Sequence, residues 1–309
     1  MNVPKVAIML ATYNGEQFIF EQLSSIADQK NIKADLYISD DGSSDQTIEI
    51  INNFAKKNPN ILIKTFIGAR KGFAKNFFSI LNKIDIDYEY YAFSDQDDLW
   101  DQHKIYKAIL CIKKYDNNIE NLYFSRTKII DSNGNHLGMS PNFKREPGFK
   151  NALLQSIGGG NTCVFNKKTF DTILKVTSYD DYDYVSHDWL LYIVITAING
   201  NVFFDKNSYI NYRQHKSNII GSNKSLKSKY RRLYDLFVNK VYVSWNDSHI
   251  KILDNLEIHP NNKYVYDCFK KCRDQSICVR TISFFRSGIY RQQSFTSFLI
   301  FLGVLFRRF

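Results

Sequence analysis

The sequence predicts an α/β fold, in which a mostly parallel, Rossmann-like sheet is flanked by helices and followed by a helical, basic extension. Three observations lead to this prediction. Segments with strand and helix periodicity alternate through residues 5–115, which is typical of parallel sheets. Polar clusters follow several strand-like segments, where such sheets bind their ligands. From about residue 225 onward the pattern is helical and rich in Lys and Arg.

The first half of the chain supplies four strand–helix pairs. Short apolar runs predict buried strands at 5–10, 36–39, 61–66 and 90–93. Apolar residues at helical spacing predict helices at 16–28, 44–57, 72–82 and 103–115. Ser43 or Ser44 is the expected N-cap of the second helix, because a side-chain hydroxyl accepts a hydrogen bond from the free N–H groups of a first turn.

The second half is less regular. Strands are predicted at 122–130, 162–165 and 209–212. A turn at 131–135 follows the first of them, and an apolar helix at 190–198 precedes the last. The motif Ser-His-Asp-Trp at 186–189 opens that helix after an acidic, tyrosine-rich stretch at 178–184.

Length and charge limit the classes of function. A chain of 309 residues suits one large domain or two modest ones. Residues 1–223 carry 25 Lys and Arg against 25 Asp and Glu, whereas residues 224–309 carry 16 against 6 and hold the whole net charge of +10. We expect this segment to face anionic lipid or solvent. A nucleic-acid partner is not expected, because the tail has no zinc finger and no RNA-recognition aromatic motif.

The cysteines and the N-terminus bear on the compartment. Five cysteines without zinc-like spacing predict thiols in a reducing cytoplasm. Cys268 and Cys272 lie one helical turn apart, so a metal site at this pair is the alternative. Residues 1–5 lead directly into a strand, so no signal peptide is expected.

The strongest chemical signal is a group of acids after the fourth predicted strand. Asp95, Asp97 and Asp98 lie within four residues. Burying such carboxylates without partners would cost several kcal/mol. A divalent cation with oxygen ligands resolves this repulsion and keeps positions open for substrate phosphates. Polar clusters at 12–14 and 40–43 also follow strands, so we expect all three clusters to share one cleft.

Five motifs in this order resemble those of the family-2 glycosyltransferases with the GT-A fold. They are Ala-Thr-Tyr-Asn-Gly at 11–15, Ser-Asp-Asp-Gly-Ser-Ser-Asp at 39–45, Ser-Asp-Gln-Asp-Asp at 94–98, Ser-His-Asp-Trp at 186–189 and Tyr-Arg-Gln-His at 212–215. The last two are most similar to the bacterial, rhamnosyltransferase-like polysaccharide branch. The resemblance implies a GT-A catalytic domain over 1–223, with a nucleotide-sugar half at 1–110 and an acceptor half at 111–223. Residues 224–309 form the extension.

The resemblance also implies a donor site and a metal site. Nine residues are expected to contact the nucleotide or the donor sugar: Thr12, Tyr13, Asn14, Asp40, Asp41, Asp95, Asp98, Arg213 and Gln214. Asp97 would bind Mn²⁺ or Mg²⁺, with Asp95 and His215 as further ligands. Asp40 and Asp98 each keep the alternative of capping the helix that follows.

Asp188 is the catalytic base that the resemblance implies. Inverting transfer needs a group that removes the proton of the acceptor hydroxyl. His187 is a rival base by its chemistry. The acceptor side is expected to include Gly159, Gly160, Asn161, His187 and Trp189.

The expected activity is inverting, metal-dependent transfer of a sugar from dTDP-rhamnose or a UDP-hexose to a glycan on a polyprenyl diphosphate lipid. The apolar segment 294–306 is too short to span a bilayer, so it is expected to lie on the inner face of the plasma membrane or to pack as a core helix or solvated cap. Six basic residues would attract the anionic lipid there: Lys227, Lys229, Arg231, Arg232, Arg280 and Arg286. A non-catalytic scaffold that binds sugar nucleotides is the alternative function, and a homodimer is left open.

Overall fold

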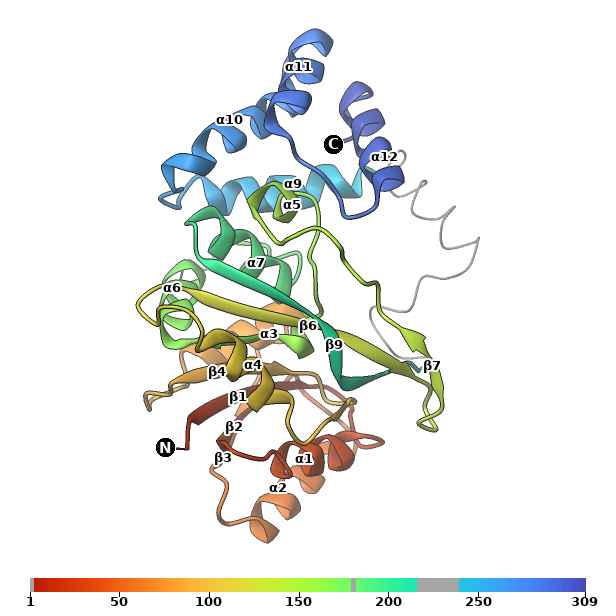
Figure 1. Cartoon of the computed structure of the whole chain (residues 1–309). Helices are drawn as coiled ribbons and strands as arrows, with labels where there is room; N and C mark the ends of the chain where they lie inside the picture. The colour runs from red at the N-terminus through yellow and green to blue at the C-terminus, as the bar shows by residue number, and fades with distance from the viewer. Residues whose placement is uncertain (1–2, 179–181, 216–238) are drawn as a thin grey trace.

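A single mixed sheet runs through the part of the chain that the computed structural model describes, residues 3–178, 182–215 and 239–309 (Figure 1). Several predictions fall outside these residues and stay untested. They concern part of the acidic stretch at 178–184, the domain boundary at 223–224, and Lys227, Lys229, Arg231 and Arg232.

The N-terminal half of the sheet is parallel, as predicted. Its strands are β1 (Lys5–Thr12), β2 (Lys33–Asp40), β3 (Ile63–Ile67) and β4 (Tyr90–Ser94), in the order β3-β2-β1-β4. Thr12 pairs with Asp40, and Leu10 pairs with Ser94. The carboxyl ends of three strands therefore meet at one edge, which is where the polar clusters follow.

The other half of the sheet mixes strand directions. Its strands are β5 (Leu99–Trp100), β6 (Asn121–Ile130), β7 (His136–Met139), β8 (Val164–Asn166) and β9 (Asn201–Arg213). β8 is antiparallel to β4 and β6, β9 runs parallel to β6, and β5 and β7 add antiparallel pairs. β9 is much longer than the predicted 209–212, because the polar Asp205–Ser208 segment hides the strand pattern where the pairing register shifts.

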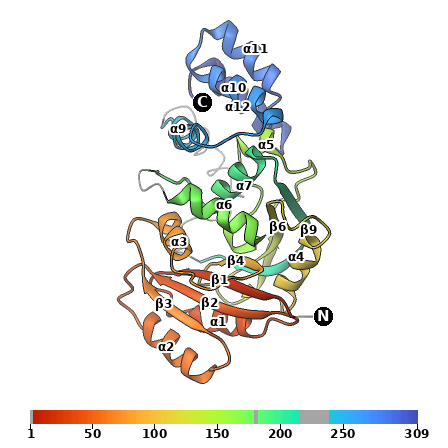
Figure 2. The same cartoon turned by 90° about the vertical axis from the view of Figure 1, so that its left-hand side faces the viewer.

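Helices cover both faces of this sheet (Figure 2). They are α1 (Ile19–Ala27), α2 (Thr47–Lys57), α3 (Phe73–Leu81), α4 (Lys104–Ile112), α5 (Phe149–Ala152), a 3-10 turn at Gly160–Thr162, α6 (Lys167–Thr177) and α7 (His187–Ala197). Alternate residues of β1 point to opposite faces: Ile8 joins a cluster with α1, α2 and α4, and Met9 joins a cluster with α3, α6 and α7.

The predicted N-cap of α2 is wrong. The helix begins at Thr47 after Gln46, which makes no capping hydrogen bond through its side chain. The Ser43 hydroxyl is used elsewhere, because it accepts the Asn14 N–H at 2.8 Å and donates to the Asp40 carboxylate. The Ser43 hydroxyl thus stabilises the turn at the end of β2 and does not make the helix cap that the sequence pattern predicts.

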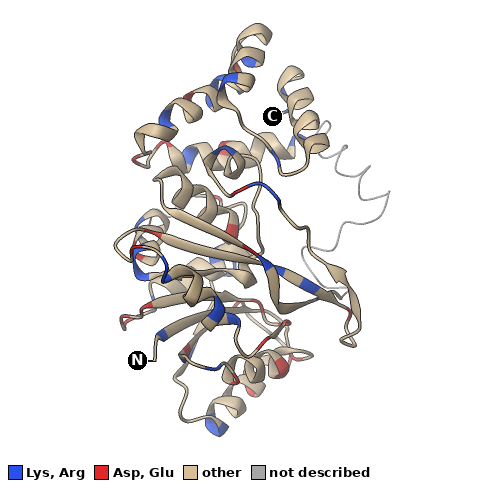
Figure 3. Ribbon diagram, viewed as in Figure 1, with Lys and Arg blue, Asp and Glu red and all other residues tan. Residues whose placement is uncertain are grey.

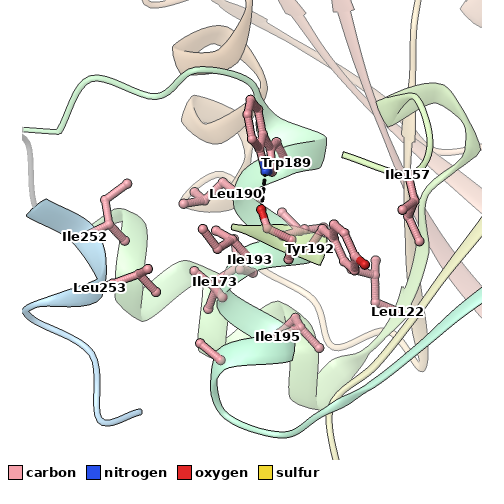
Figure 4. Close-up of a cluster of buried hydrophobic side chains, with 14 of the residues drawn as sticks. Leu122, Ile157, Ile173, Trp189, Leu190, Tyr192, Ile193, Ile195, Ile252 and Leu253 are labelled. Atoms are coloured by element: carbon pink, nitrogen blue, oxygen red, sulfur yellow. Dashed lines mark hydrogen bonds between the residues drawn. The ribbon is translucent and has the colours of Figure 1, made fainter. Parts of the chain in front are cut away.

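The extension is helical, as predicted, and it packs on the acceptor half. It consists of α9 (Val241–Leu253), α10 (Pro260–Asp274), α11 (Ile277–Ser287) and α12 (Ser294–Leu305). Ile252 and Leu253 of α9 belong to the same buried cluster as α7 (Figure 4). The Arg291 guanidinium donates to the Leu154 carbonyl at 2.9 Å, and Asn262 donates to the carbonyls that end α7. The extension and the catalytic part therefore share one core.

Trp189 lies at the centre of this joint. Its indole N–H donates to the Ala152 carbonyl at 2.7 Å, which Figure 4 draws as a dashed line. The ring meets Trp245 edge-on at 5.7 Å and His249 at 4.5 Å, both from α9. Trp189 is thus a packing residue between α7 and α9, and its predicted place on the acceptor side is not supported.

Replacing Trp189 with Ala should lower the free energy of unfolding by about 3–5 kcal/mol, because a buried indole is lost and a cavity remains. Trp189→Phe keeps most of the packing and loses the hydrogen bond to Ala152, so it should cost about 1 kcal/mol. Urea unfolding of both variants measures the difference. A Trp189→Ala variant with wild-type stability would contradict the packing role.

Candidate active site

The ends of β1 and β4 are held together by Gln96. Its side-chain oxygen accepts the Thr12 hydroxyl at 2.6 Å and the Tyr13 N–H at 2.8 Å, and its amide donates to the Tyr13 carbonyl at 3.1 Å. Thr12 is therefore buried and occupied by this clamp, whereas the Tyr13 ring is 57% exposed. Both residues are predicted to contact the donor. Tyr13 is the one whose side chain is exposed, and its ring can stack on a base.

The end of β2 is a turn organised by Asp40. Its carboxylate accepts the N–H groups of Gly42 and Ser43 at 3.0 and 2.8 Å, together with the Ser43 hydroxyl. Asn14 joins this turn from β1, because its side-chain oxygen accepts the Ser44 N–H at 2.9 Å. Asp40 and Asn14 thus fix the shape of the turn at the end of β2. The ribose contact predicted for Asp40 is not supported, since its carboxylate already serves the turn.

Asp41 differs from its neighbour. Only its Oδ1 atom has a hydrogen bond among the described residues, from the Arg70 N–H at 2.5 Å. The side chain stays partly exposed at the same edge as Tyr13. It is therefore the acid of this turn that has an oxygen to offer a ligand.

Asp97 and His215 meet across the sheet. Asp97 Oδ2 lies 2.6 Å from His215 Nε2, although the two residues are 118 positions apart in the chain. Both side chains are nearly buried. The His215 ring also lies 5.1 Å from the Phe18 ring. The sequence pattern placed both residues in one metal site, and the fold brings them into contact.

Asp98 is fully buried and joins three segments. Its carboxylate accepts the Arg213 main-chain N–H at 3.2 Å and the Asn161 side-chain N–H at 2.6 Å. Burial, and next the charges of Asp97 and Asp95, raise the pKa of Asp98 well above its usual value. Asp98 and Asn161 therefore hold the site together and are enclosed by protein, so direct contact with the donor or acceptor sugar is not supported for either.

Arg213 is a positioning residue in this arrangement. It donates to the Asp97 carbonyl at 3.0 Å, to the Ser132 carbonyl at 2.9 Å and to the Glu21 carboxylate at 2.6 Å. The side chain is only 3% exposed, and the guanidinium lies 4.4 Å over the Phe18 ring. Direct contact with a diphosphate, predicted for Arg213, is therefore not supported.

Gln214 continues the ladder of β6 and β9. Its main-chain N–H donates to the Ile130 carbonyl at 2.8 Å. This bond fixes the short segment that leads from Arg213 to His215. The donor contact predicted for the Gln214 side chain stays a prediction.

The donor atoms suit Mn²⁺ or Mg²⁺, although the ligands do not stand in a ready-made site. In the described parts of the chain, no group of three His, Cys, Asp or Glu side chains is arranged to hold a metal. Neighbouring ligand atoms around an octahedral ion lie about 3 Å apart. The 2.6 Å between Asp97 Oδ2 and His215 Nε2 would need to open by a few tenths of an ångström. Burial, then the charges of Asp97 and Asp188, raise the pKa of Asp95 to about 7. A bound cation would oppose this rise, because it favours the charged carboxylate.

Asp188 lies in the first turn of α7 and is partly exposed. Its charge acts on Asp95, which places the two carboxylates in one electrostatic neighbourhood. The implied base thus lies close enough to the strand-end acids for its charge to act on Asp95.

His187 is enclosed and unsuited to proton transfer. Its ring stacks on Phe77 at 4.0 Å and meets Phe93 edge-on at 5.0 Å. Both ring nitrogens are buried and have no hydrogen-bond partner among the described residues. Burial lowers the pKa of His187 to about 4, so the ring is neutral at pH 7. The alternative that His187 is the base is therefore not supported.

The glycine loop lies directly against this ring. A Cβ atom added to Gly160 would come within 1.7 Å of His187 Nε2. A Cβ atom on Gly159 would lie 2.7 Å from the Asn161 side-chain oxygen. His187 thus packs against the loop, and the absence of a side chain at Gly160 permits the close approach.

Lys104 is a site residue that the sequence pattern did not identify. It begins α4 and is 2% exposed, with its ammonium 3.4 Å from the centroid of the Trp100 ring. Burial lowers its pKa to about 7, although the charges of Asp98 and Asp95 favour its charged form. The sequence does carry a signal for Lys104. It is a Lys four residues after a Trp, at the start of a predicted helix that follows three acids. Glu21, Ser132 and Gln96 gave none, because their roles depend on tertiary contacts.

Sequence comparison points to one family. Residues 7–174 match the family model described as glycosyl transferase family 2. The curated protein dTDP-rhamnosyl transferase RfbG of Shigella flexneri is 34% identical over 244 residues, which cover 75% of this chain and 80% of that protein. An uncharacterized glycosyltransferase of Rickettsia typhi is 24% identical over 244 residues, covering 77% of this chain and 73% of that protein.

Structural comparison agrees with the predicted fold. S. aureus TarS 1-349 in complex with UDP-GlcNAc has a TM-score of 0.53 at 13% identity and covers 97% of this chain and 90% of its own. The mannosyltransferase PcManGT from Pyrobaculum calidifontis, in complex with GDP-Man and Mn²⁺, has a TM-score of 0.53 at 12% identity, with 100% and 85% covered. At these identities the likeness establishes the fold alone, and the GT-A prediction is confirmed.

Gly160→Ala should disrupt the loop, because the new methyl group would overlap the His187 ring. We expect a fall of several degrees in the thermal midpoint, since overpacking a well-filled site costs about 1–3 kcal/mol. The double variant Gly160→Ala/His187→Ala removes the overlap, so Gly160→Ala should cost less stability in the His187→Ala background than in the wild type. Strictly additive losses in the double variant would contradict the close approach.

Proposed function

Because this chain belongs to glycosyl transferase family 2, we propose that it moves a sugar from dTDP-rhamnose to a hydroxyl group of a growing cell-surface glycan. A UDP-hexose is the second candidate donor. The relative in Shigella flexneri, described as a dTDP-rhamnosyl transferase, favours the first. The observation that supports the proposal most is that Asp41 and the Asp95–Asp97 loop follow strands β2 and β4, which both pair with β1, and that the charge of Asp188 acts on Asp95.

The nucleotide would bind at the ends of β1 and β2. Asp41 keeps a carboxylate oxygen that can accept the imide N–H of thymine or uracil, which cytosine lacks. The exposed Tyr13 ring lies at the same edge and can stack on the base. These two side chains would select a nucleotide whose pyrimidine base carries an imide. The sugar would be recognised by residues of the acceptor half.

The diphosphate would lie at the loop after β4. Asp97, Asp95 and His215 are the residues that would hold Mn²⁺ or Mg²⁺. A bound cation would neutralise the charge that develops on the departing nucleoside diphosphate. Arg213 supports this loop by donating to the Asp97 carbonyl, which fixes the main chain of the principal ligand. The metal dependence of this chain is part of the proposal.

Sugar transfer would proceed by a single displacement. The acceptor oxygen attacks the anomeric carbon, the bond from that carbon to the diphosphate oxygen breaks, and the electron pair leaves with the nucleoside diphosphate. The acceptor proton passes to the Asp188 carboxylate. The hydroxyl becomes acidic as its new bond forms, so an ordinary carboxylate suffices. Attack from the face opposite to the leaving group inverts the anomeric configuration.

The acceptor in this proposal is a glycan on polyprenyl diphosphate at the inner face of the plasma membrane. The charge distribution supports this, because the extension carries the whole net positive charge of the chain. A non-catalytic scaffold is disfavoured, since the chain is a glycosyltransferase by family and keeps its set of acids.

Asp97→Ala and Asp188→Ala should each reduce transfer by a factor of about 10² or more, for different reasons. Asp97→Ala should also weaken nucleotide binding in the presence of Mn²⁺, because it removes a metal ligand. Asp188→Ala should leave that binding nearly unchanged. Steady-state kinetics and isothermal titration with the nucleoside diphosphate separate the two. Near wild-type turnover in Asp188→Ala would show that another group is the base.

Thermal shift with a panel of sugar nucleotides, with and without Mn²⁺, should identify the donor. We expect dTDP-rhamnose to raise the thermal midpoint most, and only when the cation is present. Asp41→Asn should reduce the preference for dTDP and UDP over CDP, because the amide can donate to the cytosine ring nitrogen. Equal stabilisation by GDP and CDP sugars would contradict the donor assignment.

A further inference from the structure

The last two helices leave an unusual apolar surface uncovered. We define the aromatic face as the exposed side chains Ile282, Phe285, Phe295, Phe298 and Phe306. The four phenylalanines are 67, 69, 54 and 66% exposed, in that order. Isolated exposed apolar residues are common on proteins, but a group of large aromatic ones marks an interaction site.

The two helices meet through aromatic contacts with the ring of Phe301. Phe285 of α11 lies 5.3 Å from Phe301 of α12, and Phe284 packs on the same ring at 5.3 Å. Along α12, positions 295, 298, 302 and 306 fall on one side at helical spacing. The opposite side, with Ile300 and Val304, is buried in the protein. The helix thus uses one side for the core and presents the other to the outside.

The segment that carries this face has charged side chains of one sign. Residues 275–309 contain five arginines and no Asp or Glu. Arg286 and Arg307 are exposed, and Figure 3 shows basic residues along the extension that forms this end of the molecule. Arg280 is nearly buried and donates to the Leu305 carbonyl at 2.9 Å, which ties α11 to the end of α12. Aromatic groups and cationic groups are therefore combined on a fixed pair of helices.

We propose that the aromatic face docks on an anionic phospholipid bilayer, with its phenylalanines inserted at the headgroup level. An interfacial site needs apolar side chains beside cations, and this face has both. A second copy of the chain would bring the same positive segment, so charge repulsion opposes a symmetric dimer at this surface. No helix in the described ranges is long and apolar enough to cross a bilayer, and the 12 residues of α12 span about 18 Å.

Docking would place the extension against the bilayer, while sugar transfer would take place at the carboxyl ends of the strands. Figures 1 and 2 place α11 and α12 at the end of the molecule opposite α2 and β3. The inference rests on the proposed function in one respect only, namely that a lipid-linked acceptor gives the docking a purpose. Binding to lipid can be measured without any acceptor.

The test is co-sedimentation of the full chain with vesicles of phosphatidylglycerol and phosphatidylcholine, against vesicles of phosphatidylcholine alone. We expect binding to the first kind and at least tenfold weaker binding to the second. Phe295→Ser/Phe298→Ser should lower the affinity for anionic vesicles at least tenfold. Arg307→Gln/Arg308→Gln should lower it roughly fivefold for each arginine removed.

A matched control removes exposed apolar side chains elsewhere. Ile86 and Leu110 are 44 and 41% exposed on the catalytic part, so Ile86→Ser/Leu110→Ser should bind vesicles like the wild type. All variants should keep the thermal midpoint and the donor hydrolysis rate of the wild type, which reports on the active site separately. Wild-type vesicle binding by the Phe295/Phe298 variant would overturn the proposal. So would a dimer in sedimentation velocity that the same variant dissociates.

Discussion

The buried carboxylate of Asp98 is the interaction on which the candidate site depends. It joins the loop after β4 to the end of β9 through the Arg213 N–H, and to the glycine loop through Asn161. These three segments lie far apart in the chain, and each carries a different part of the site. A carboxylate that is fully buried needs such partners, because an unpaired charge in the interior costs several kcal/mol. Its hydrogen bonds therefore set where the cation, the donor sugar and the acceptor would meet.

Around this anchor the acids divide by role. The carboxylates of Asp40 and Asp98 bond to groups of the protein itself, while Asp41, Asp95 and Asp188 stay partly exposed. The sequence gives no sign of this division, since neighbouring acids in one motif look alike. The raised pKa of Asp95 reflects the same crowding, because like charges are confined where solvent is reduced. A cation bound there would relieve this repulsion.

Much of the fold followed from local pattern, and much of the site did not. The parallel half of the sheet was predictable because its strands are continuous apolar runs followed by turn residues. β9 was only partly predictable, because a polar segment interrupts its pattern. Trp189 and Arg213 were assigned to ligands because of their motifs, yet the first packs on α9 and the second binds three groups of the protein. A motif identifies which residues gather at a site, whereas their partners decide which ones face the ligand.

The clamp made by Gln96 has a thermodynamic consequence. One amide holds the end of β1, where the base would stack, and it belongs to the same loop as Asp95 and Asp97. Anything that shifts the end of β1 must therefore shift the loop that carries Asp95 and Asp97. Coupling of this kind is reciprocal, so nucleoside and metal should each strengthen the binding of the other by the same factor. The enzyme would then recognise the nucleotide and its counter-ion as one unit, and would discriminate against either one arriving alone.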